Sequence, residues 1–94
     1  MTVDTIQVAR GHVIVMFTDG RNAFITGELT LKNEFYVFFR GTDWKWITRP
    51  ERSVYFLKDE SVLGDIADED KEDIIAALNE YTKGSSFRAI IDYR

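Results

Sequence analysis

The sequence predicts an α+β fold in which an antiparallel β meander of about five to seven strands packs against one helix. The helix lies in the C-terminal half and is followed by a final strand. Three observations lead to this prediction. Up to residue 58 the chain alternates short β-branched or aromatic runs with turn residues. A single helical apolar periodicity then covers residues 68–83, and residues 87–93 return to a period of two.

The meander begins with a hairpin. His12 to Thr18 is apolar on both faces, which is typical of a central strand. The dipeptide Asp19-Gly20 tolerates the positive φ of a tight turn, and Ala23 to Thr26 supplies the return strand.

Three further strands follow before the helix. Glu28 to Lys32 alternates, so we expect Leu29 and Leu31 to point inward. After a turn at residues 32–34, Phe35 to Arg40 forms a strand that is apolar on both faces and ends at Gly41-Thr42-Asp43. The remaining expected elements are a short strand from Trp44 to Thr48, a bend at Arg49-Pro50-Glu51 and a strand from Ser53 to Leu57.

The helix is predicted over Asp68 to Lys83, with acids in its first turn, Lys83 in its last turn and Gly84 at the C′ position. We expect Asp65 or Asp68 to be the N-cap. The expected buried face carries Ile74, Leu78 and Tyr81, widened by Ile75 and Ala77. The final strand runs from Phe87 to Tyr93 and aligns Phe87, Ala89, Ile91 and Tyr93 on one face.

Length and composition limit the class of protein. The chain has 94 residues, of which 45% are hydrophobic, so we expect one globular domain over residues 1–94. It contains no cysteine, which excludes disulfides and thiolate metal sites. The sequence shows neither an apolar run of membrane-spanning length nor a signal-peptide pattern. We therefore expect a cytoplasmic protein that does not associate with a membrane.

Catalytic motifs are absent from the sequence. The one histidine, His12, stands at the head of an apolar strand, and the serines lie in no Gly-x-Ser-x-Gly pattern. The acids from Asp68 onward do not form a calcium loop, because the sixth position is Asp73 where a glycine is required. We therefore expect no enzyme activity, no metal site and no cofactor.

Charge is distributed unevenly along the chain. Residues 1–58 have a net charge of +2 and residues 59–94 a net charge of −6, which together give −4. Eight of the sixteen acids lie between residues 59 and 73, where Lys71 is the single base. Acids at a helix start are favoured by the helix dipole, which accounts for part of this cluster. The remainder indicates a surface that attracts a basic partner and repels nucleic acid.

A second feature is the aromatic and basic stretch of residues 40–58. Trp44 and Trp46 point to the same face if the segment is extended, and Arg49 follows them. The two tryptophans are either core residues or anchors of an interface, since tryptophan and arginine dominate binding hot spots. The stretch could also stack single-stranded nucleic acid, although an isoelectric point near 4.9 argues against that use.

Four features of the chain together resemble a known family. They are Trp44-Lys45-Trp46 to Pro50, the segment Ile66 to Ile75, the helix ending at Gly84 and the strand through Ile91. This layout resembles the small immunity proteins of bacterial polymorphic-toxin and contact-dependent inhibition systems. The resemblance implies a short, acidic, cytoplasmic α+β domain that docks on a cognate toxin domain, often a basic nuclease, and blocks its active site. The chain departs from the usual pattern at Ala67, where a Ser or Thr N-cap would be usual.

These observations predict an immunity or inhibitor protein, a monomer or weak dimer, that binds a basic toxin domain. A nucleic-acid-binding or regulatory module using residues 40–58 and a phage-associated structural oligomer remain as alternatives. The expected partner-binding residues are five acids and three possible anchors: Asp68, Glu69, Asp70, Glu72, Asp73, Trp44, Trp46 and Arg49.

Overall fold

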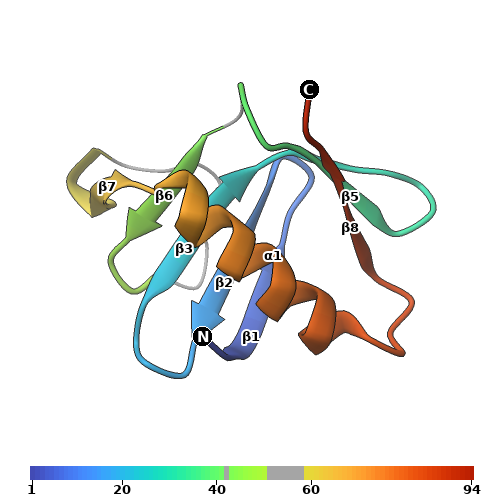
Figure 1. Ribbon diagram of the computed structural model, residues 1–94, viewed down its shortest axis with the longest axis horizontal. Coiled ribbons are helices and arrows are strands. Elements are labelled where there is room, and N and C mark those ends of the chain that lie inside the picture. The colour runs from blue at the N-terminus through green and yellow to red at the C-terminus, as the bar shows by residue number, and fades with distance from the viewer. Residues whose placement is uncertain (42, 51–58) are drawn as a thin grey trace.

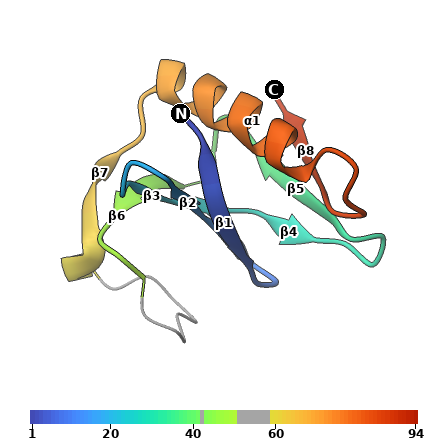
Figure 2. The same ribbon diagram turned by 90° about the horizontal axis from the view of Figure 1, so that it is seen from below.

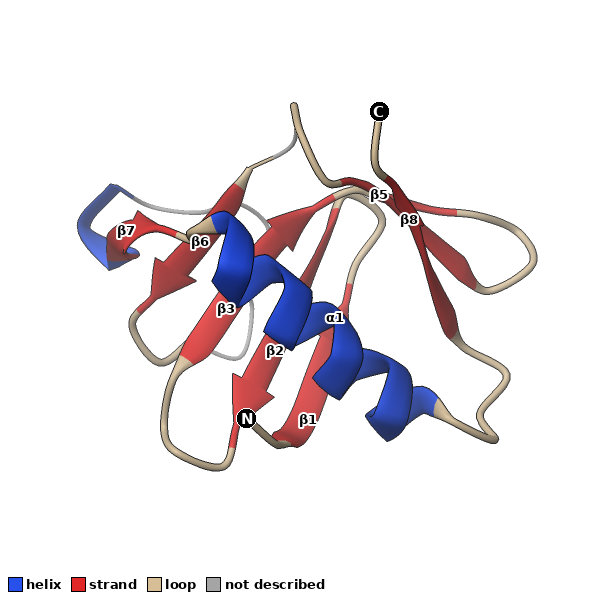
Figure 3. Cartoon of the chain, viewed as in Figure 1, coloured by secondary structure: helices blue, strands red, loops and turns tan. Residues whose placement is uncertain are grey.

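A computed structural model of the chain describes residues 1–41, 43–50 and 59–94, and these residues form two β-sheets, one α-helix and a short 3-10 helix (Figure 3). The predicted α+β class is confirmed, as is the order of an antiparallel sheet, a helix and a final strand. The strand predicted from Ser53 to Leu57 lies outside the described residues.

The larger sheet has five strands in the order β1-β2-β3-β6-β7, and each neighbouring pair is antiparallel. The predicted hairpin is confirmed: β2 and β3 are joined through Gly20, which has a φ of 93°. The strand bounds are β1 Val3–Val8, β2 His12–Phe17, β3 Asn22–Thr26, β6 Trp44–Ile47 and β7 Val62–Asp65. The short 3-10 helix Asp59–Ser61 leads directly into β7, a strand that the sequence pattern did not predict.

The smaller sheet contains β4 (Glu28–Leu29), β5 (Glu34–Phe38) and β8 (Arg88–Asp92), in the order β4-β5-β8. Whereas β4 and β5 are antiparallel, β5 and β8 run parallel, with Glu34 opposite Arg88 and Phe38 opposite Asp92. The predicted meander is therefore divided between two sheets, and the final strand, β8, is an edge strand of the smaller one.

The prediction that Leu31 points inward is wrong, because β4 ends at Leu29 and Leu31 is fully exposed. The chain turns earlier than the alternation suggests. The Thr30 hydroxyl accepts hydrogen bonds from the backbone N–H groups of Lys32 and Glu34, each at 3.3 Å. These bonds fold residues 30–34 into a turn, in which Asn33 has a φ of 61°.

Helix α1 (Asp68–Thr82) lies across one face of the larger sheet (Figures 1 and 2). Its buried side chains are Ile74, Ile75, Leu78 and Thr82. Tyr81, which was expected on this face, is 44% exposed, so that part of the prediction is wrong. The helix ends one residue earlier than expected, with Lys83 as C-cap, and Gly84 has the positive φ (82°) that the C′ position favours.

The main core lies between α1 and the two sheets. Phe35 and Ile74, both 0% exposed, come from β5 and α1, and residues of β2 and β3 join them. Ala89 and Ile91 of β8 pack against this core, as the predicted alternation requires. Tyr93 is 54% exposed and covers the core edge by stacking on Phe39, with ring centroids 5.2 Å apart.

The opposite face of the larger sheet carries a smaller cluster of Ile14, Phe24 and Ile47. The His12 ring stacks on Phe24 with a centroid distance of 4.7 Å. The sheet is therefore apolar on both faces at its centre, which explains why β2 is apolar at nearly every position.

Candidate functional site

Five carboxylates gather at the start of α1, and we call Asp68, Glu69, Asp70, Glu72 and Asp73 the acidic face. Four of them are exposed and Asp70 is partly buried. Three occupy the first turn of the helix, where negative charge is stabilised by the unpaired backbone N–H groups. The helix therefore presents these carboxylates on a rigid element.

The helix begins without a side-chain cap. The predicted N-cap at Asp65 or Asp68 is wrong: Ala67 occupies that position with extended φ and ψ of −67° and 154°, and it can offer no side-chain acceptor. Asp65 belongs to β7 and pairs with Lys45, while Asp68 is already helical. First-turn acids compensate in part for the missing cap.

Lys71, the one base within the acidic cluster, turns inward. Its Nζ donates a hydrogen bond to the Phe39 carbonyl oxygen at 2.9 Å and lies 3.2 Å from Oδ1 of Asp68. The same ammonium group lies 4.9 Å and 5.6 Å from the ring centroids of Phe39 and Trp44. Its side chain is 13% exposed, so its positive charge is directed to Asp68 and the aromatic rings and little of it reaches solvent.

The two tryptophans of β6 share one face, as the sequence predicted, since both pack against the main core. They differ in exposure. Trp44 is 4% exposed and its indole N–H donates to the Phe38 carbonyl oxygen at 3.2 Å. Trp44 therefore acts as a core residue and offers almost no area to a partner, whereas Trp46 is only partly buried.

Trp46 forms a small cluster with residues of the β2–β3 hairpin. Its ring contacts Phe17 edge to face at 6.3 Å, and the Arg21 guanidinium lies 5.1 Å from its centroid. Arg21 pairs with Asp19 at 2.7 Å, and this hydrogen-bonded pair holds the pKa of Asp19 below its ordinary value. The pKa of Arg21 is raised by the same bond, and the charge of Asp70 adds to the effect.

The charge of Asp70 acts on Arg21 and so connects the Trp46 cluster electrostatically to the acidic face. Sequence reasoning missed Asp19 and Arg21, although the spacing Asp-Gly-Arg in a tight turn is a usable signal for such a pair. Arg49 is exposed just beyond the end of β6.

The aromatic and basic stretch is only partly described. Arg52, Tyr55, Phe56 and Lys58 lie outside the described residues. Within the described part, Lys45 forms an ion pair with Asp65, and this hydrogen bond raises the pKa of Lys45.

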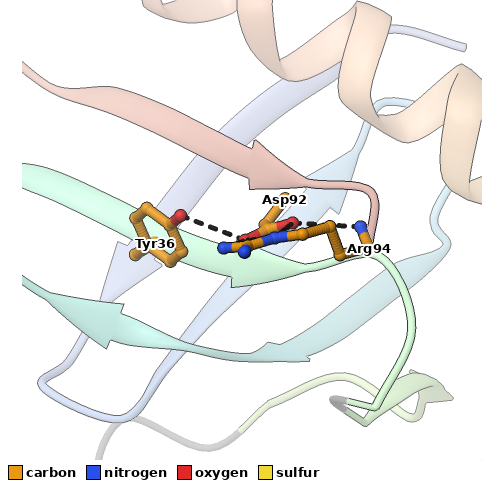
Figure 4. Close-up of polar contacts among 3 residues, drawn as sticks. All are labelled: Tyr36, Asp92 and Arg94. Carbon is orange, nitrogen blue, oxygen red and sulfur yellow. Dashed lines mark hydrogen bonds and ion pairs between the residues drawn. The ribbon is translucent and has the colours of Figure 1, made fainter.

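A second polar cluster lies on the outer face of the smaller sheet (Figure 4). The Tyr36 hydroxyl donates to Asp92 at 3.2 Å, and Arg94 approaches the same carboxylate through Nη2 at 2.9 Å. The Asp92 side chain is 7% exposed, and its bonds to Arg94, with a smaller contribution from Tyr36, lower its pKa to about 2. Asp92 and Arg94 are thus both charged at neutral pH.

Among residues 1–41, 43–50 and 59–94, no three His, Cys, Asp or Glu side chains are placed to hold one metal ion. The same residues contain no helix that is long and apolar enough to span a membrane. Comparison with protein-family models, curated proteins and solved structures found no match to this chain.

Proposed function

We propose that this protein is an immunity or inhibitor protein that binds a basic toxin domain and blocks it through the acidic face. The observation that carries the proposal is the inward position of Lys71. This ammonium group lies against Phe39 and Trp44 and pairs with Asp68. The exposed carboxylates of Glu69, Glu72 and Asp73 have no ion-pair partner among the described residues.

The acidic face suits a partner that holds phosphates. A nuclease binds its substrate through positive charges, and a row of carboxylates on a rigid helix can occupy those charges in place of phosphates. Charge complementarity also steers the encounter and increases the association rate, which suits the capture of a harmful partner. A preformed helix loses little conformational entropy on binding.

Trp46 and Arg49 complete the proposed contact surface. Trp46 supplies a partly buried aromatic ring beside Arg21, on which the charge of Asp70 acts. Trp44 has a supporting role beneath the surface, where its ring lies 5.6 Å from the Lys71 ammonium. The nucleic-acid alternative receives less support, because Trp44 is buried and Lys45 is paired with Asp65.

The test combines gene context with charge variants. The proposal predicts a toxin-bearing reading frame next to this gene, and a neighbourhood without one would contradict it. That reading frame is co-expressed with the wild-type chain or with the triple variant Glu69→Gln, Glu72→Gln, Asp73→Asn. We expect the triple variant to lose protection against growth arrest and to bind the toxin domain about tenfold or more weakly, mainly through slower association. Affinity and rates are measured by surface plasmon resonance at two salt concentrations.

A matched control removes the same number of charges elsewhere. The variant Asp4→Asn, Asp43→Asn, Glu80→Gln neutralises three exposed acids outside the acidic face. It should protect as well as the wild type. Full protection by the acidic-face variant, or equal loss in both variants, would show that the acidic face does not carry the interaction.

A further inference from the structure

An open hollow of ≈ 600 Å³ lies where β3 leads into the smaller sheet, lined by Thr26, Gly27, Glu28, Thr30, Tyr36 and Phe38. We propose that this hollow takes a cationic side chain, an arginine or a lysine, from a protein partner. The proposal concerns a surface separate from the acidic face and does not depend on the toxin-inhibitor proposal.

The walls of the hollow follow from the alternation of β5. Phe35 and Val37 point into the core and are at most 2% exposed, so the intervening Tyr36 and Phe38 point outward. The rings of Tyr36 and Phe38 have centroids 5.5 Å apart and an interplanar angle of 69°. Two rings at such an angle form two walls of a corner, which can offer aromatic faces to a single cation.

A negative charge stands beside these rings. Glu28 is directly opposite Tyr36 in the antiparallel register of β4 and β5, so the two side chains share the outer face. Glu28 is exposed, and among the described residues it has no ion-pair partner. A guanidinium or ammonium group between the rings and Glu28 would gain both cation–π and ionic attraction.

The neighbouring polar cluster holds Tyr36 in place without adding a net charge. The Tyr36 hydroxyl donates to Asp92, and the negative charge of Asp92 is matched by Arg94 (Figure 4). A phenol that donates to a carboxylate is polarised toward a more electron-rich ring, which favours a cation on its face. Among the described residues that line the hollow, Glu28 is the one with a charged side chain, and its sign favours a cationic occupant.

The experiment uses N-acetyl-arginine methylamide as probe and N-acetyl-citrulline methylamide as its neutral counterpart of nearly the same shape. Each is titrated into the ¹⁵N-labelled full chain, and amide shifts are followed by NMR. We expect the arginine probe to shift Glu28, Tyr36 and Phe38 with millimolar affinity. The citrulline probe should bind at least about fivefold more weakly, because it lacks the charge that the rings and Glu28 attract.

Two variants test the walls of the hollow. Glu28→Gln and Phe38→Leu should each weaken binding of the arginine probe about threefold or more, and both positions are exposed enough for the fold to be retained. Retention of the fold is checked by the dispersion of the amide spectrum.

Leu31→Ser, at a fully exposed position outside the hollow, is the matched control and should leave binding unchanged. The acidic-face triple variant should also bind the probe normally, which separates this proposal from the toxin-inhibitor proposal. Equal binding of the citrulline probe would overturn the inference. So would shifts that map to the acidic face, or no shift at 50 mM probe.

Discussion

Gly27 stands alone between β3 and β4, where the chain leaves the larger sheet and enters the smaller one. Its backbone N–H donates to the Gly11 carbonyl oxygen at 3.0 Å. A Cβ atom at Gly27 would lie 2.5 Å from both Cε1 of Phe35 and the Tyr36 carbonyl oxygen. The close approach of the two sheets therefore depends on the absence of a side chain at this residue.

We expect Gly27→Ala to lower the free energy of unfolding by about 1–3 kcal/mol, because the new methyl group must displace backbone and a packed ring. Gly11→Ala is the matched control, since a Cβ there meets nothing within 4 Å. The control should be neutral or slightly stabilising through the unfolded state. Urea denaturation followed by circular dichroism measures both; equal stability of the two variants would contradict the packing argument.

His12 illustrates how burial determines a residue's chemistry. It is 7% exposed, stacks on Phe24 and is the single histidine of the chain. Burial lowers its pKa from 6.5, because desolvation disfavours the imidazolium form. The unfolded chain therefore takes up the proton at a higher pH than the folded chain does.

It follows that the His12 contribution to stability is complete above pH 6.5 and is lost as the pH falls from 6.5 through the lower pKa of the folded state. NMR titration of the imidazole should give a pKa below 6.5. In His12→Phe, which keeps a ring against Phe24, the loss of stability between pH 7 and pH 5 should be smaller than in the wild type. An identical pH dependence in both proteins would mean that folding leaves the pKa of His12 unchanged, which would contradict the burial argument.

At the scale of elements, the two ends of α1 differ in how well the local sequence predicts them. The periodic apolar residues and the glycine after the helix predicted its extent to within one residue at the C-terminal end. The N-cap was mispredicted because Asp65 forms an ion pair with Lys45, a residue far away in the sequence. Lys71 then fixes the helix start to the end of β5 through Phe39.

The uncapped start allows a direct test. Ala67→Ser places a hydroxyl where it can accept a hydrogen bond from the backbone N–H of Glu69 or Asp70, and we expect about 1 kcal/mol of added stability. Ala76→Ser, at an exposed position within the helix, provides the control. It should lower stability by about 0.5 kcal/mol or less through helix propensity. Thermal unfolding compares the two, and a loss of stability in Ala67→Ser would refute the capping argument.

At the scale of the whole molecule, one core joins the two sheets and the helix. Phe35 of the smaller sheet is fully buried and belongs to the same cluster as Val15 of the larger sheet and Leu78 of α1. The two sheets therefore share their main apolar contacts. We therefore expect the described residues to unfold as one unit.

We expect Phe35→Ala to lower stability by about 3–5 kcal/mol, because it leaves a cavity in the shared core. Phe38→Ala, on the outer face of the same strand and 42% exposed, should lower the free energy of unfolding much less. If the chain unfolds as one unit, tryptophan fluorescence, which reports on β6, and far-ultraviolet circular dichroism should give coincident transitions in every variant. Separate transitions would mean that the two sheets fold independently.

The sequence by itself determined what depends on neighbours within a few residues. Runs that are apolar on both faces specified β2 and β5, and the turn at Asp19-Gly20 specified β3 as the return strand. Helical periodicity specified α1, and the run of acids specified a charged helix start whose members are mostly exposed. Even the shared face of Trp44 and Trp46 followed from the pleat of an extended strand.

Tertiary structure alone decided the parallel pairing of β5 with β8, the burial of Trp44 and the inward position of Lys71. Each depends on segments far apart along the chain, such as Glu34 and Arg88, that meet only when the core forms. Local propensity carries no information about such pairings, because their free energy comes from the apolar area that the assembled sheets and helix bury together. The acidic face therefore combines charges present in the sequence with a tertiary contact that holds Lys71 inward against Phe39, beside Asp68.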